Sequence, residues 1–573
     1  MLVFYDIECF SKLWTVTLII PSECKTIQIV NNFDEVKELY KRYKNFIWIA
    51  YNGRNYDQYM IKTMLLEFEP KKLNDFIIKE NRNGWEYCSE FNKIPLVTYD
   101  CMVQDTSLKK LEGFMGSDIR ECDIDFDYDG EFTKEMIDEV LSYNLRDVKE
   151  MMEVFLLTKN EFNSQLALVK EFNLPLRDIG KTQAQLAAKI LGAVKVIRND
   201  EWNIRLPIEL ELHKYKYIAD WFMNKENQNY KCSLTTNVCG VEHTFAYGGG
   251  HGAIPNFIYE CKDDEMMIMS DIAQMYPHLM TEHKLMSRNV TKPEQFNFIL
   301  SESLRLKALG EKKKREPYKR VCNIVYGAMG DKYNSLYDPL HRNLVCVYGQ
   351  VLMVMLLEQL EKVQSFKLIQ NNTDGILFLI KTKDFDLVDD IIYEWEQKTR
   401  LKMEFEYFDK VIQGDVNNYI AIKNDGKTKG KGAYFKDLSP IDNDLPIVNK
   451  AIKDYLINNI PVENTIYGCD DFMQFQQIVR VSNKYQYAMH GNKKLKEKTL
   501  RVYASKDKQD EGIYKVKDID GSLRVEKAAS TPINAFIFNK KVRGLKCPSK
   551  LDKKWYVDLA YYRISKKVPD VIN

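Results

Sequence analysis

The stretch Phe366-Lys-Leu-Ile-Gln-Asn-Asn-Thr-Asp-Gly-Ile-Leu-Phe-Leu-Ile380 sets two apolar runs on either side of a polar cluster. Asn, Asp and Gly favour tight turns, so this pattern predicts a β-hairpin whose turn carries one carboxylate, Asp374. A carboxylate held at such a turn is costly unless a cation or a hydrogen-bond donor binds it. For this stretch taken alone, an ordinary surface turn is the competing interpretation.

A second carboxylate upstream changes that balance. Met266-Met-Ile-Met-Ser-Asp271 is a predicted strand that ends on Asp271 and runs into Ile-Ala-Gln-Met-Tyr-Pro277. Two aspartates at the ends of neighbouring strands are the minimum needed to hold a pair of magnesium ions, and such a pair supports nucleotidyl transfer. That reaction also needs cationic contacts to a triphosphate.

A basic helical segment offers such cations. Lys307, Arg315 and Lys319 follow one another at spacings of eight and four, which is compatible with one helix face. Tyr326 shares the face of Lys319, and with Tyr276 it is a candidate to stack on a base and sugar. A solvated basic helix and two core tyrosines are the competing interpretations.

A separate set of acidic residues lies near the N-terminus and on a long helix. Asp6 and Glu8 are two residues apart on a predicted strand, so they share one face. Asp57 begins the following helix, and Tyr143 and Asp147 are four apart on one helix face. Three chain segments thus supply four carboxylates and a phenol, the set needed for two-metal phosphodiester hydrolysis. Surface charge is the competing interpretation for Asp-x-Glu alone.

Length and charge indicate several domains and a segregated surface. At 573 residues the chain is too long for one core. The net charge of +1 hides an asymmetry, because residues 481–573 hold 22 Lys and Arg against 10 Asp and Glu, leaving 61 against 72 elsewhere. A basic C-terminal part suits a phosphate backbone, while an acidic remainder suits metal ions. A merely solvated, Lys-rich surface explains the charge equally well.

Composition predicts a globular protein of the cytoplasm. The hydrophobic fraction is 45% and the charged fraction 29%, and no apolar run is expected to reach the roughly 18 residues of a membrane span. The N-terminus enters a strand at once, without a signal peptide. The twelve cysteines form no Cys-x-x-Cys pair, so reduced thiols are expected.

The periodicity predicts an α/β, multi-domain chain. Strands at 2–8, 12–21 and 25–30, a helix at 34–43, a strand at 45–51 and a helix at 56–66 give an α/β sheet of ribonuclease-H type. A long helix is expected at 133–159, a basic helical hairpin at 286–335 and a helix at 345–363. After the Asp374 hairpin, a helix at 384–400 and a strand at 402–408 are expected.

Taken in order, these motifs resemble a known family. The series comprises Asp6-Ile-Glu8, Asn52-x3-Tyr56-Asp57, Ser107-Leu-Lys-Lys-Leu111, Tyr143-x3-Asp147, Tyr247-Gly-Gly-Gly250, Asp271-x4-Tyr276-Pro277, Lys319-x3-Asn323-x2-Tyr326-Gly327 and Thr373-Asp374. It is similar to the motif series of family B DNA polymerases with a 3′–5′ proofreading exonuclease, especially those of bacteriophages and mobile elements, which include the protein-primed group. The resemblance covers most of residues 1–420. Each motif is weak, but the ordered set is highly specific.

The resemblance implies an architecture. It is a ribonuclease-H-like exonuclease domain at 1–185 followed by a right-hand polymerase, with palm at 186–285 and 336–445, fingers at 286–335 and thumb at 446–573.

The resemblance also implies roles for individual residues. Asp6, Glu8, Asp57 and Asp147 would bind the exonuclease metals, with Tyr143 orienting the attacking water. Asp271 and Asp374, helped by the carbonyl of Ile272, would hold the polymerase ions, which are Mg²⁺ or, with the same oxygen ligands, Mn²⁺. The nucleotide-binding set would be Lys319, Lys307, Arg315, Asn323, Tyr326 and Tyr276, the last as a gate against a ribose 2′-hydroxyl. The DNA-binding set would be Asn52, Ser107, Leu108, Tyr247, Gly249, Gly250 and Tyr419.

The chain departs from the family pattern at three positions. Asn372 replaces the first carboxylate of the usual Asp-Thr-Asp-Ser, Ile324 stands where Ser is usual, and Asn417-Asn-Tyr419 replaces the usual Lys-x-Tyr. About 41 residues separate Pro277 from Lys319 and about 44 separate Gly327 from Asn372. These intervals leave no room for the two insertions of protein-primed relatives, given typical loop lengths.

The short intervals favour a compact enzyme that extends a nucleic-acid primer, and a monomer is expected. Its implied partners are primer-template DNA, deoxynucleoside triphosphates and phage replication proteins. A terminal-protein-primed polymerase and a primer-template-binding accessory protein with a decayed polymerase site are the alternatives.

Overall fold

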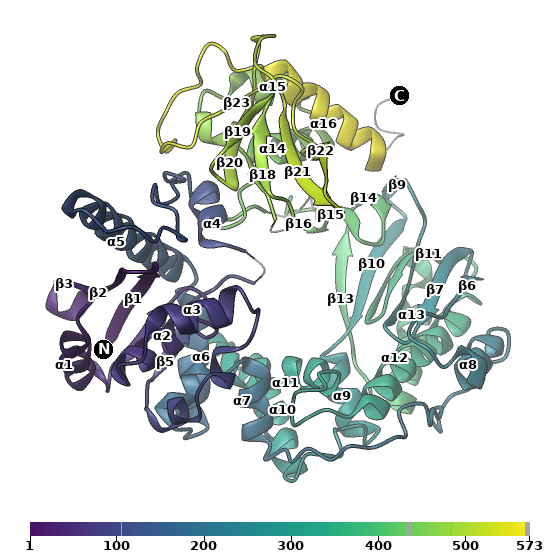
Figure 1. Cartoon of the computed structure of the whole chain (residues 1–573). Helices are drawn as coiled ribbons and strands as arrows, with labels where there is room; N and C mark the ends of the chain where they lie inside the picture. Colours follow the sequence, from purple (N-terminus) through teal and green to yellow (C-terminus); the bar gives the residue numbers. More distant parts are fainter. Residues whose placement is uncertain (105, 433–434, 436, 483, 568–573) are drawn as a thin grey trace. The chain divides into compact units, whose positions relative to one another are not determined.

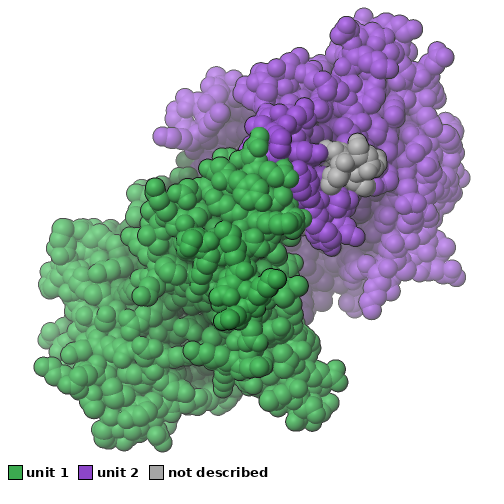
Figure 2. Space-filling model, turned by 90° about the horizontal axis from the view of Figure 1, so that it is seen from above, with its two compact units in different colours: residues 1–181, 437–451, 462–559 green, residues 182–436, 452–461, 560–573 purple. Residues whose placement is uncertain are grey.

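The computed structural model describes residues 1–104, 106–432, 435, 437–482 and 484–567. The chain forms two compact units, and each is described by itself below (Figure 2). Unit 1 comprises Met1–Lys181, Asp437–Ala451 and Val462–Leu559. Unit 2 comprises Thr182–Lys436, Ile452–Pro461 and Ala560–Asn573.

Unit 1 begins with a five-stranded mixed sheet in the order β3-β2-β1-β4-β5 (Figure 1). The strand β1 pairs antiparallel with β2 and parallel with β4, so it lies in the middle of the sheet. All the strands expected in the first 51 residues are confirmed, with small shifts of their ends. The strands are β1 (Leu2–Cys9), β2 (Trp14–Ile20), β3 (Lys25–Val30), β4 (Ile47–Ala50) and β5 (Thr98–Asp100).

Helices follow from apolar residues at helical spacing. The longest, α5, begins after Thr133, whose side chain accepts a hydrogen bond from the amide of Met136, and its buried residues Val140, Val148 and Val154 recur on one face. It packs against β1 and β2. The expected helix at 133–159 is therefore confirmed. The helices here are α1 (Phe33–Tyr43), α2 (Asp57–Leu65), α3 (Pro70–Ile78), α4 (Leu108–Met115), α5 (Lys134–Leu157) and α6 (Lys159–Glu171).

The C-terminal part of unit 1 contains two small antiparallel sheets, of orders β17-β20-β23 and β19-β18-β21-β22. Their shared core includes Val479, Leu500 and Val502. The strands are β17 (Gln477–Arg480), β18 (Tyr487–His490), β19 (Lys493–Leu495), β20 (Thr499–Ala504), β21 (Ile513–Ile519), β22 (Ser522–Lys527) and β23 (Ala535–Ile537), and the helix α15 (Val462–Gly468) also belongs to this part. The helices α14 (Pro446–Asn458) and α16 (Lys553–Lys567) begin in the residue ranges of unit 1 and end in those of unit 2.

One buried arginine joins β20 to the end of α4. Arg501 is fully buried, and its guanidinium donates to the carbonyls of Gly113 at 3.1 Å, Ser117 at 2.7 Å and Lys540 at 2.6 Å. A guanidinium carries only N–H donors, so the three carbonyl oxygens supply the acceptors that it needs when buried. The last turn of α4 is thereby fixed by a residue almost 400 positions later in the chain.

Unit 2 is built on a seven-stranded sheet of order β13-β10-β12-β11-β8-β7-β6 and a four-stranded sheet of order β16-β15-β14-β9. The predicted hairpin around Asp374 is confirmed as β11 and β12. The strands are β6 (Ser233–Val238), β7 (Val241–Ala246), β8 (Gly249–Ala253), β9 (Phe257–Glu260), β10 (Glu265–Ile272), β11 (Lys367–Asn372), β12 (Gly375–Lys381), β13 (Met403–Phe408), β14 (Lys410–Asp415), β15 (Asn418–Ile422) and β16 (Thr428–Lys431).

The helices of unit 2 include the expected basic hairpin, confirmed as α10 and α11, which pack against each other. The helices expected at 345–363 and 384–400 are confirmed as α12 and α13. The helices are α7 (Gln183–Ile190), α8 (Lys216–Met223), α9 (Met275–Glu282), α10 (Pro293–Ala308), α11 (Lys312–Met329), α12 (Pro339–Leu360) and α13 (Phe385–Thr399).

The helix α12 corrects one expectation from the sequence. It is long and apolar enough to cross a membrane by length and composition, whereas no such run was expected. However, 94% of its most apolar window is buried inside the protein. Its all-round apolar surface is that of a core helix, covered by α9, α11 and α13.

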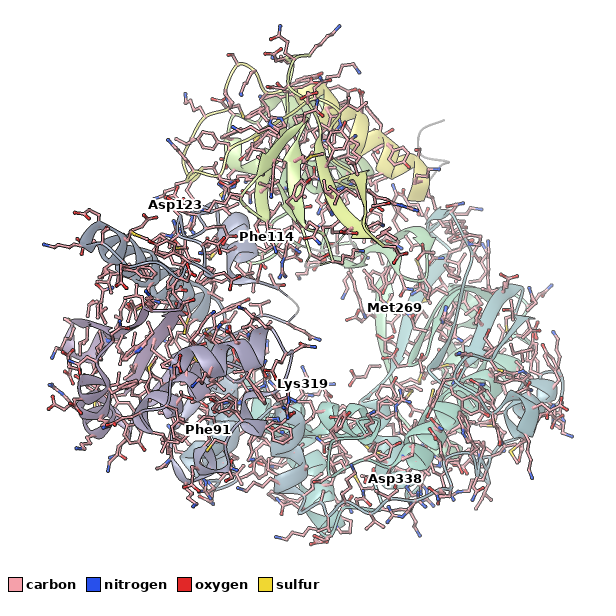
Figure 3. The ribbon with its side chains drawn as sticks, viewed as in Figure 1. Phe91, Phe114, Asp123, Met269, Lys319 and Asp338 are labelled. Atoms are coloured by element: carbon pink, nitrogen blue, oxygen red, sulfur yellow. The ribbon has the colours of Figure 1, made fainter. Side chains whose placement is uncertain are left out.

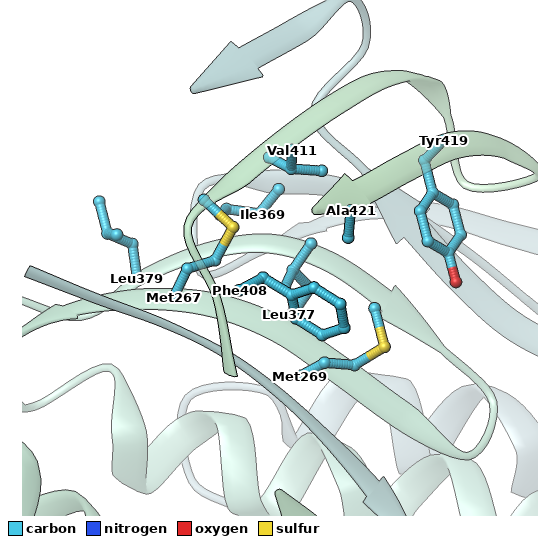
Figure 4. Packing of buried hydrophobic residues seen from close by; sticks show 9 residues of the cluster. All are labelled: Met267, Met269, Ile369, Leu377, Leu379, Phe408, Val411, Tyr419 and Ala421. Atoms are coloured by element: carbon cyan, nitrogen blue, oxygen red, sulfur yellow. The ribbon is translucent and has the colours of Figure 1, made fainter. Parts of the chain in front are cut away.

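A cluster of buried apolar residues packs the two sheets of unit 2 together (Figure 4). Met267, Met269 and Leu377 come from the seven-stranded sheet, and Val411 and Ala421 come from the four-stranded sheet. All five are buried. Because β10 and β12 are anchored there, the residues at their ends have a fixed backbone.

Candidate active sites

The four acidic residues proposed from the sequence, together with Asp127, line one cavity of about 560 Å³ in unit 1. Asp6 and Glu8 occupy alternate positions of β1 and so share a face of the sheet. Asp57 is the first residue of α2, and Asp147 lies on α5, which packs on β1. The structure therefore brings together all four acidic residues that the sequence proposed.

The four carboxylates repel one another. Burial raises the pKa of Asp57 well above its usual range, and the charge of Asp6 raises it further. Burial also raises the pKa of Glu8, to which Asp6 and Asp147 add. In the described part of the chain, Asp57 Oδ1 is buried and has no hydrogen-bond partner. Unpaired buried carboxylates of this kind need a cation or a proton.

Two neighbours of these carboxylates were not identified from the sequence. Lys109 on α4 is buried, and its Nζ donates to Asp147 Oδ1 at 2.7 Å and to Glu112 Oε1 at 2.9 Å. Asn144 is also buried and donates from Nδ2 to Asp6 Oδ2 at 2.6 Å. They hold Asp147 and Asp6 in place. The Tyr143-x3-Asp147 spacing contains Asn144, but nothing local in the sequence indicates its partner.

The other residues proposed for this site are not all at the cavity. Asn52 lines it, and its side-chain oxygen accepts from Asn55 at 2.8 Å. Tyr143 is buried and lines a neighbouring cavity instead, with Lys109 Nζ 4.7 Å from its ring centre. Ser107 and Leu108 stand at the start of α4 and do not line the carboxylate cavity.

Asp271 and Asp374 meet where the interior strand β10 ends and β12 begins in the seven-stranded sheet of unit 2. Asp271 is the register partner of Gly375, and the Ile272 amide donates to the Asp374 carbonyl at 2.7 Å. Both aspartates line a cavity of about 150 Å³ with Asn372, Tyr419 and other residues. The structure thus brings the two predicted carboxylates to one place.

The expectation that an unbound Asp374 carboxylate would be energetically costly is wrong. Its side chain is exposed, so water can solvate it without a bound cation. Asp271 is the less solvated of the two, and burial raises its pKa while Lys429 lowers it and Asp374 raises it. The electrostatic demand for a cation therefore falls on Asp271.

A lysine and a glutamate next to Asp271 were missed by the sequence reasoning. Lys429 Nζ lies 3.0 Å from Asp271 Oδ2 and 3.1 Å from Glu406 Oε2. Glu404, on the adjacent strand β13, is the register partner of Asp271. The site thus has more carboxylates than the hairpin alone suggests. Cross-strand neighbours depend on sheet register, which local sequence does not give.

The tyrosines proposed for nucleotide binding stack on each other. The rings of Tyr276 and Tyr326 lie 4.1 Å apart at 8°. Burial raises the pKa of Tyr276 to about 12, and the nearby charges of Cys346 and Asp374 raise it as well. Of the two tyrosines, Tyr276 is therefore the one whose pKa responds to the charge of Asp374. Asn323 is exposed three residues before Tyr326 on α11.

The three cations predicted to bind the triphosphate, Lys319, Lys307 and Arg315, have different surroundings in the structure. Lys319 is exposed on α11, and both α11 and β10, which carries Met269, belong to unit 2. Figure 3 labels Lys319 and Met269. Lys307 at the end of α10 forms an ion pair with Glu404, the register partner of Asp271. Arg315 points to Ser303 Oγ at 3.4 Å. Lys307 is thus tied to the strand beside Asp271, and Arg315 is tied to α10.

The glycine-rich stretch packs against the turn that holds Asp374. Gly249 has a φ of +146°, and a Cβ there would stand 2.8 Å from Thr373 Oγ1. Thr373 Oγ1 donates to the Gly250 carbonyl at 3.2 Å. Tyr247 is fully buried and donates to the Phe222 carbonyl at 2.9 Å, so its side chain is unable to touch a template strand. These glycines allow β8 to approach the hairpin closely.

No tight metal-ligand cluster is preassembled. Among the residues that the structure describes, no three His, Cys, Asp or Glu side chains are grouped so that they hold an ion by themselves. Mg²⁺ in phosphoryl-transfer sites is usually bound by one or two carboxylates, with water and substrate phosphates completing its shell. The paired carboxylates of both sites suit that arrangement.

Comparisons with known proteins gave likenesses among solved structures only. No protein-family model matches the chain, and no curated protein matches it. Among solved structures, the chain is similar to the family B DNA polymerase from the hyperthermophilic archaeon Pyrobaculum calidifontis, with a TM-score of 0.44 and 12% identity over 100% of this chain and 78% of that one. We therefore argue function from the two sites themselves.

Proposed function

We propose that this chain is a DNA polymerase with a 3′–5′ exonuclease. The observation that carries the proposal is the meeting of Asp271 and Asp374 across β10 and β12 in one cavity. Tyr276, whose pKa is raised by the charge of Asp374, stacks on Tyr326. A second cavity in the other compact unit, lined by Asp6, Glu8, Asp57 and Asp147 and by Asp127, supports the hydrolytic activity. One chain with both sites would extend a strand and trim its 3′ end.

Both sites suit divalent magnesium. In unit 1 the fit rests on the unpartnered, buried Asp57 Oδ1 and on the mutual repulsion of Asp6, Glu8 and Asp147. In unit 2 it rests on the half-buried carboxylate of Asp271 beside Asp374, with the Ile272 carbonyl as a further oxygen donor. When bound, magnesium would neutralise developing negative charge and activate the attacking oxygen.

The polymerase residues would act by positioning and charge. Asp271 has a backbone fixed by β10, and Asp374 is fixed by the hairpin turn. Tyr276, stacked on Tyr326, would bound the sugar pocket because its ring is held by the second ring. Lys319 is exposed on the same helix as Tyr326, so its ammonium would contact the triphosphate.

The exonuclease residues would act similarly. Asn144 would fix the orientation of the Asp6 carboxylate, and Lys109 would fix that of Asp147. The amide of Asn52 lines the same cavity and would bind the terminal nucleotide. We propose palm, fingers and thumb roles for 186–285 with 336–445, for 286–335 and for 446–573, after an exonuclease domain at 1–185.

A primer-extension gel with a labelled primer tests both activities together. Asp374→Ala is expected to abolish extension and spare 3′-end degradation, and Asp6→Ala with Glu8→Ala is expected to do the reverse. Asp389→Ala, an exposed aspartate on α13, is the matched control. Normal incorporation by Asp374→Ala would show that the synthesis site is misplaced.

The same gel separates the alternatives. A terminal-protein-primed enzyme would extend only a supplied protein primer and ignore the DNA primer. An accessory protein would bind primer-template with no extension by the wild-type chain under any primer. Extension from a plain DNA primer supports the proposal over both.

A further inference from the structure

A cationic cavity of about 360 Å³ lies beside the carboxylate cavity of unit 1. Most of its lining comes from one face of α5, with Arg120 contributed by the segment after α4. Three of its residues are cations, Arg120, Arg146 and Lys149, and one is a carboxylate, Glu139. None of them has a part in the proposed chemistry of the carboxylates.

The two cavities carry opposite charge. The carboxylate cavity is lined by Asp6, Glu8, Asp57, Asp147 and Asp127 against only two lysines. A nucleic-acid strand is a polyanion, so its phosphates beyond the reacting bond would be repelled there unless cations lie close by. The neighbouring cavity has the surplus of positive charge that such a phosphate requires.

Two of the three cations of this cavity, Arg146 and Lys149, have no carboxylate partner among the described residues. Arg146 Nη2 donates to the Arg120 carbonyl at 2.7 Å, but in the described part of the chain its buried Nε has no hydrogen-bond partner. Neither Arg146 nor Lys149 is in an ion pair with a described carboxylate, whereas Arg120 lies 3.2 Å from Asp123 and 3.7 Å from Glu139. The charge of Arg146 and Lys149, which line the cavity, is therefore available to an anion there.

Tyr143 links the two cavities. Its ring lines the cationic cavity, while Asp147, one turn further along α5, lines the carboxylate cavity. Lys109 approaches the ring at 4.7 Å and the Arg146 guanidinium at 5.8 Å. The two cavities are thus lined by neighbouring turns of the same helix, α5.

We propose that Arg120, Arg146 and Lys149 form a phosphate-binding subsite of the exonuclease. The inference rests on the proposed exonuclease function. The ligand is a nucleotide phosphate, and it has two sources: a phosphodiester of the bound single strand, or the 5′-phosphate of the released mononucleotide. Arginine suits either, because its planar fork pairs with two phosphate oxygens.

The test compares Arg146→Gln with the wild-type chain and with Lys134→Gln, which removes an exposed cation at the start of the same helix. Binding of a labelled single-stranded oligonucleotide is measured without divalent metal, so that it is separate from hydrolysis. KM, kcat and inhibition by a nucleoside 5′-monophosphate are then measured with magnesium.

If the subsite binds the strand, Arg146→Gln weakens oligonucleotide binding and raises KM about tenfold or more, with kcat retained. The slope of the logarithm of the binding constant against the logarithm of the salt concentration also becomes shallower by about 0.7, because one phosphate contact is lost. If it binds the product, KM stays and inhibition by the monophosphate weakens by a similar factor. Arg146→Lys is expected to restore part of either effect.

The proposal is overturned if binding, KM and product inhibition of Arg146→Gln all equal those of Lys134→Gln. Arg120→Gln and Lys149→Gln, both at exposed positions, carry the same test if Arg146→Gln does not fold. A wild-type chain that binds strands through Arg146 without hydrolysing them would refute the exonuclease and leave the subsite standing. If the wild-type chain hydrolyses the strand and substitution of these cations has no effect, the subsite is refuted and the exonuclease stands.

Discussion

Adding a single methyl group at Gly375 tests the position of Asp271 most sharply. Gly375 stands opposite Asp271 in the β10–β12 register. A Cβ at Gly375 would lie 2.0 Å from Asp271 Oδ1, 3.0 Å from its Cγ and 3.1 Å from its Cα. Gly375→Ala would therefore force the Asp271 carboxylate to move while leaving the hairpin sequence otherwise unchanged.

The size of the movement follows from these contacts. Ordinary contact begins at 3.4 Å, so the Oδ1 atom must move by about 1.4 Å, which a rotation of the side chain provides. The backbone contact is only slightly tight, so the loss of stability should stay near 1 kcal/mol, at the low end for overpacking. A displacement of about 1 Å in a catalytic group costs roughly 100-fold in rate.

Single-turnover primer extension measures this effect directly. Gly375→Ala is expected to slow incorporation about 100-fold while 3′-end degradation by unit 1 keeps its rate. Gly468→Ala is the matched control, because a Cβ there has no atom within 4 Å. Extension by Gly375→Ala at the rate of Gly468→Ala would show that the Asp271 carboxylate does not take part in synthesis.

Three further changes probe unit 1. Lys109→Met should slow 3′-end degradation roughly 100-fold with extension retained, since a site carboxylate loses its partner, and Lys110→Met should not. Asp57→Asn should raise the melting temperature of the metal-free chain at pH 8. Because folding raises the pKa of Asp57, its carboxyl group destabilises the folded state by an amount that is absent below about pH 4 and grows as the pH rises. A higher melting temperature of Asp57→Asn at pH 3 would contradict this cause. Arg501→Met should lower the free energy of unfolding by about 3–5 kcal/mol in urea titrations, with the exposed Arg480→Met near zero.

The sequence predicted the elements of the two sites better than their surroundings. The Asp374 hairpin, the Asp271 strand and the early strands and helices follow local rules of period and turn composition, and these are confirmed. Lys109 and Glu406 were missed, because their partners lie 38 positions away or across sheet registers that no local pattern encodes. The burial of Tyr247 was missed for the same reason, since the residues that cover it come from other segments.

Asn417 stands where the family that the chain resembles usually has a lysine, and sheet pairing brings a different lysine to the neighbourhood of Tyr419. Asn417 is exposed outside the cavity of Asp271, but Tyr419, two residues later, lines that cavity. Lys429 lines it too, because β16 pairs antiparallel with β15 and sets Lys429 opposite Ala421 on the strand of Tyr419. A lysine and a tyrosine therefore still reach one site, although they are ten positions apart in the chain. The ammonium group beside Asp271 offsets charge there in the absence of magnesium, so a motif search that requires the lysine at position 417 underestimates what this site contains.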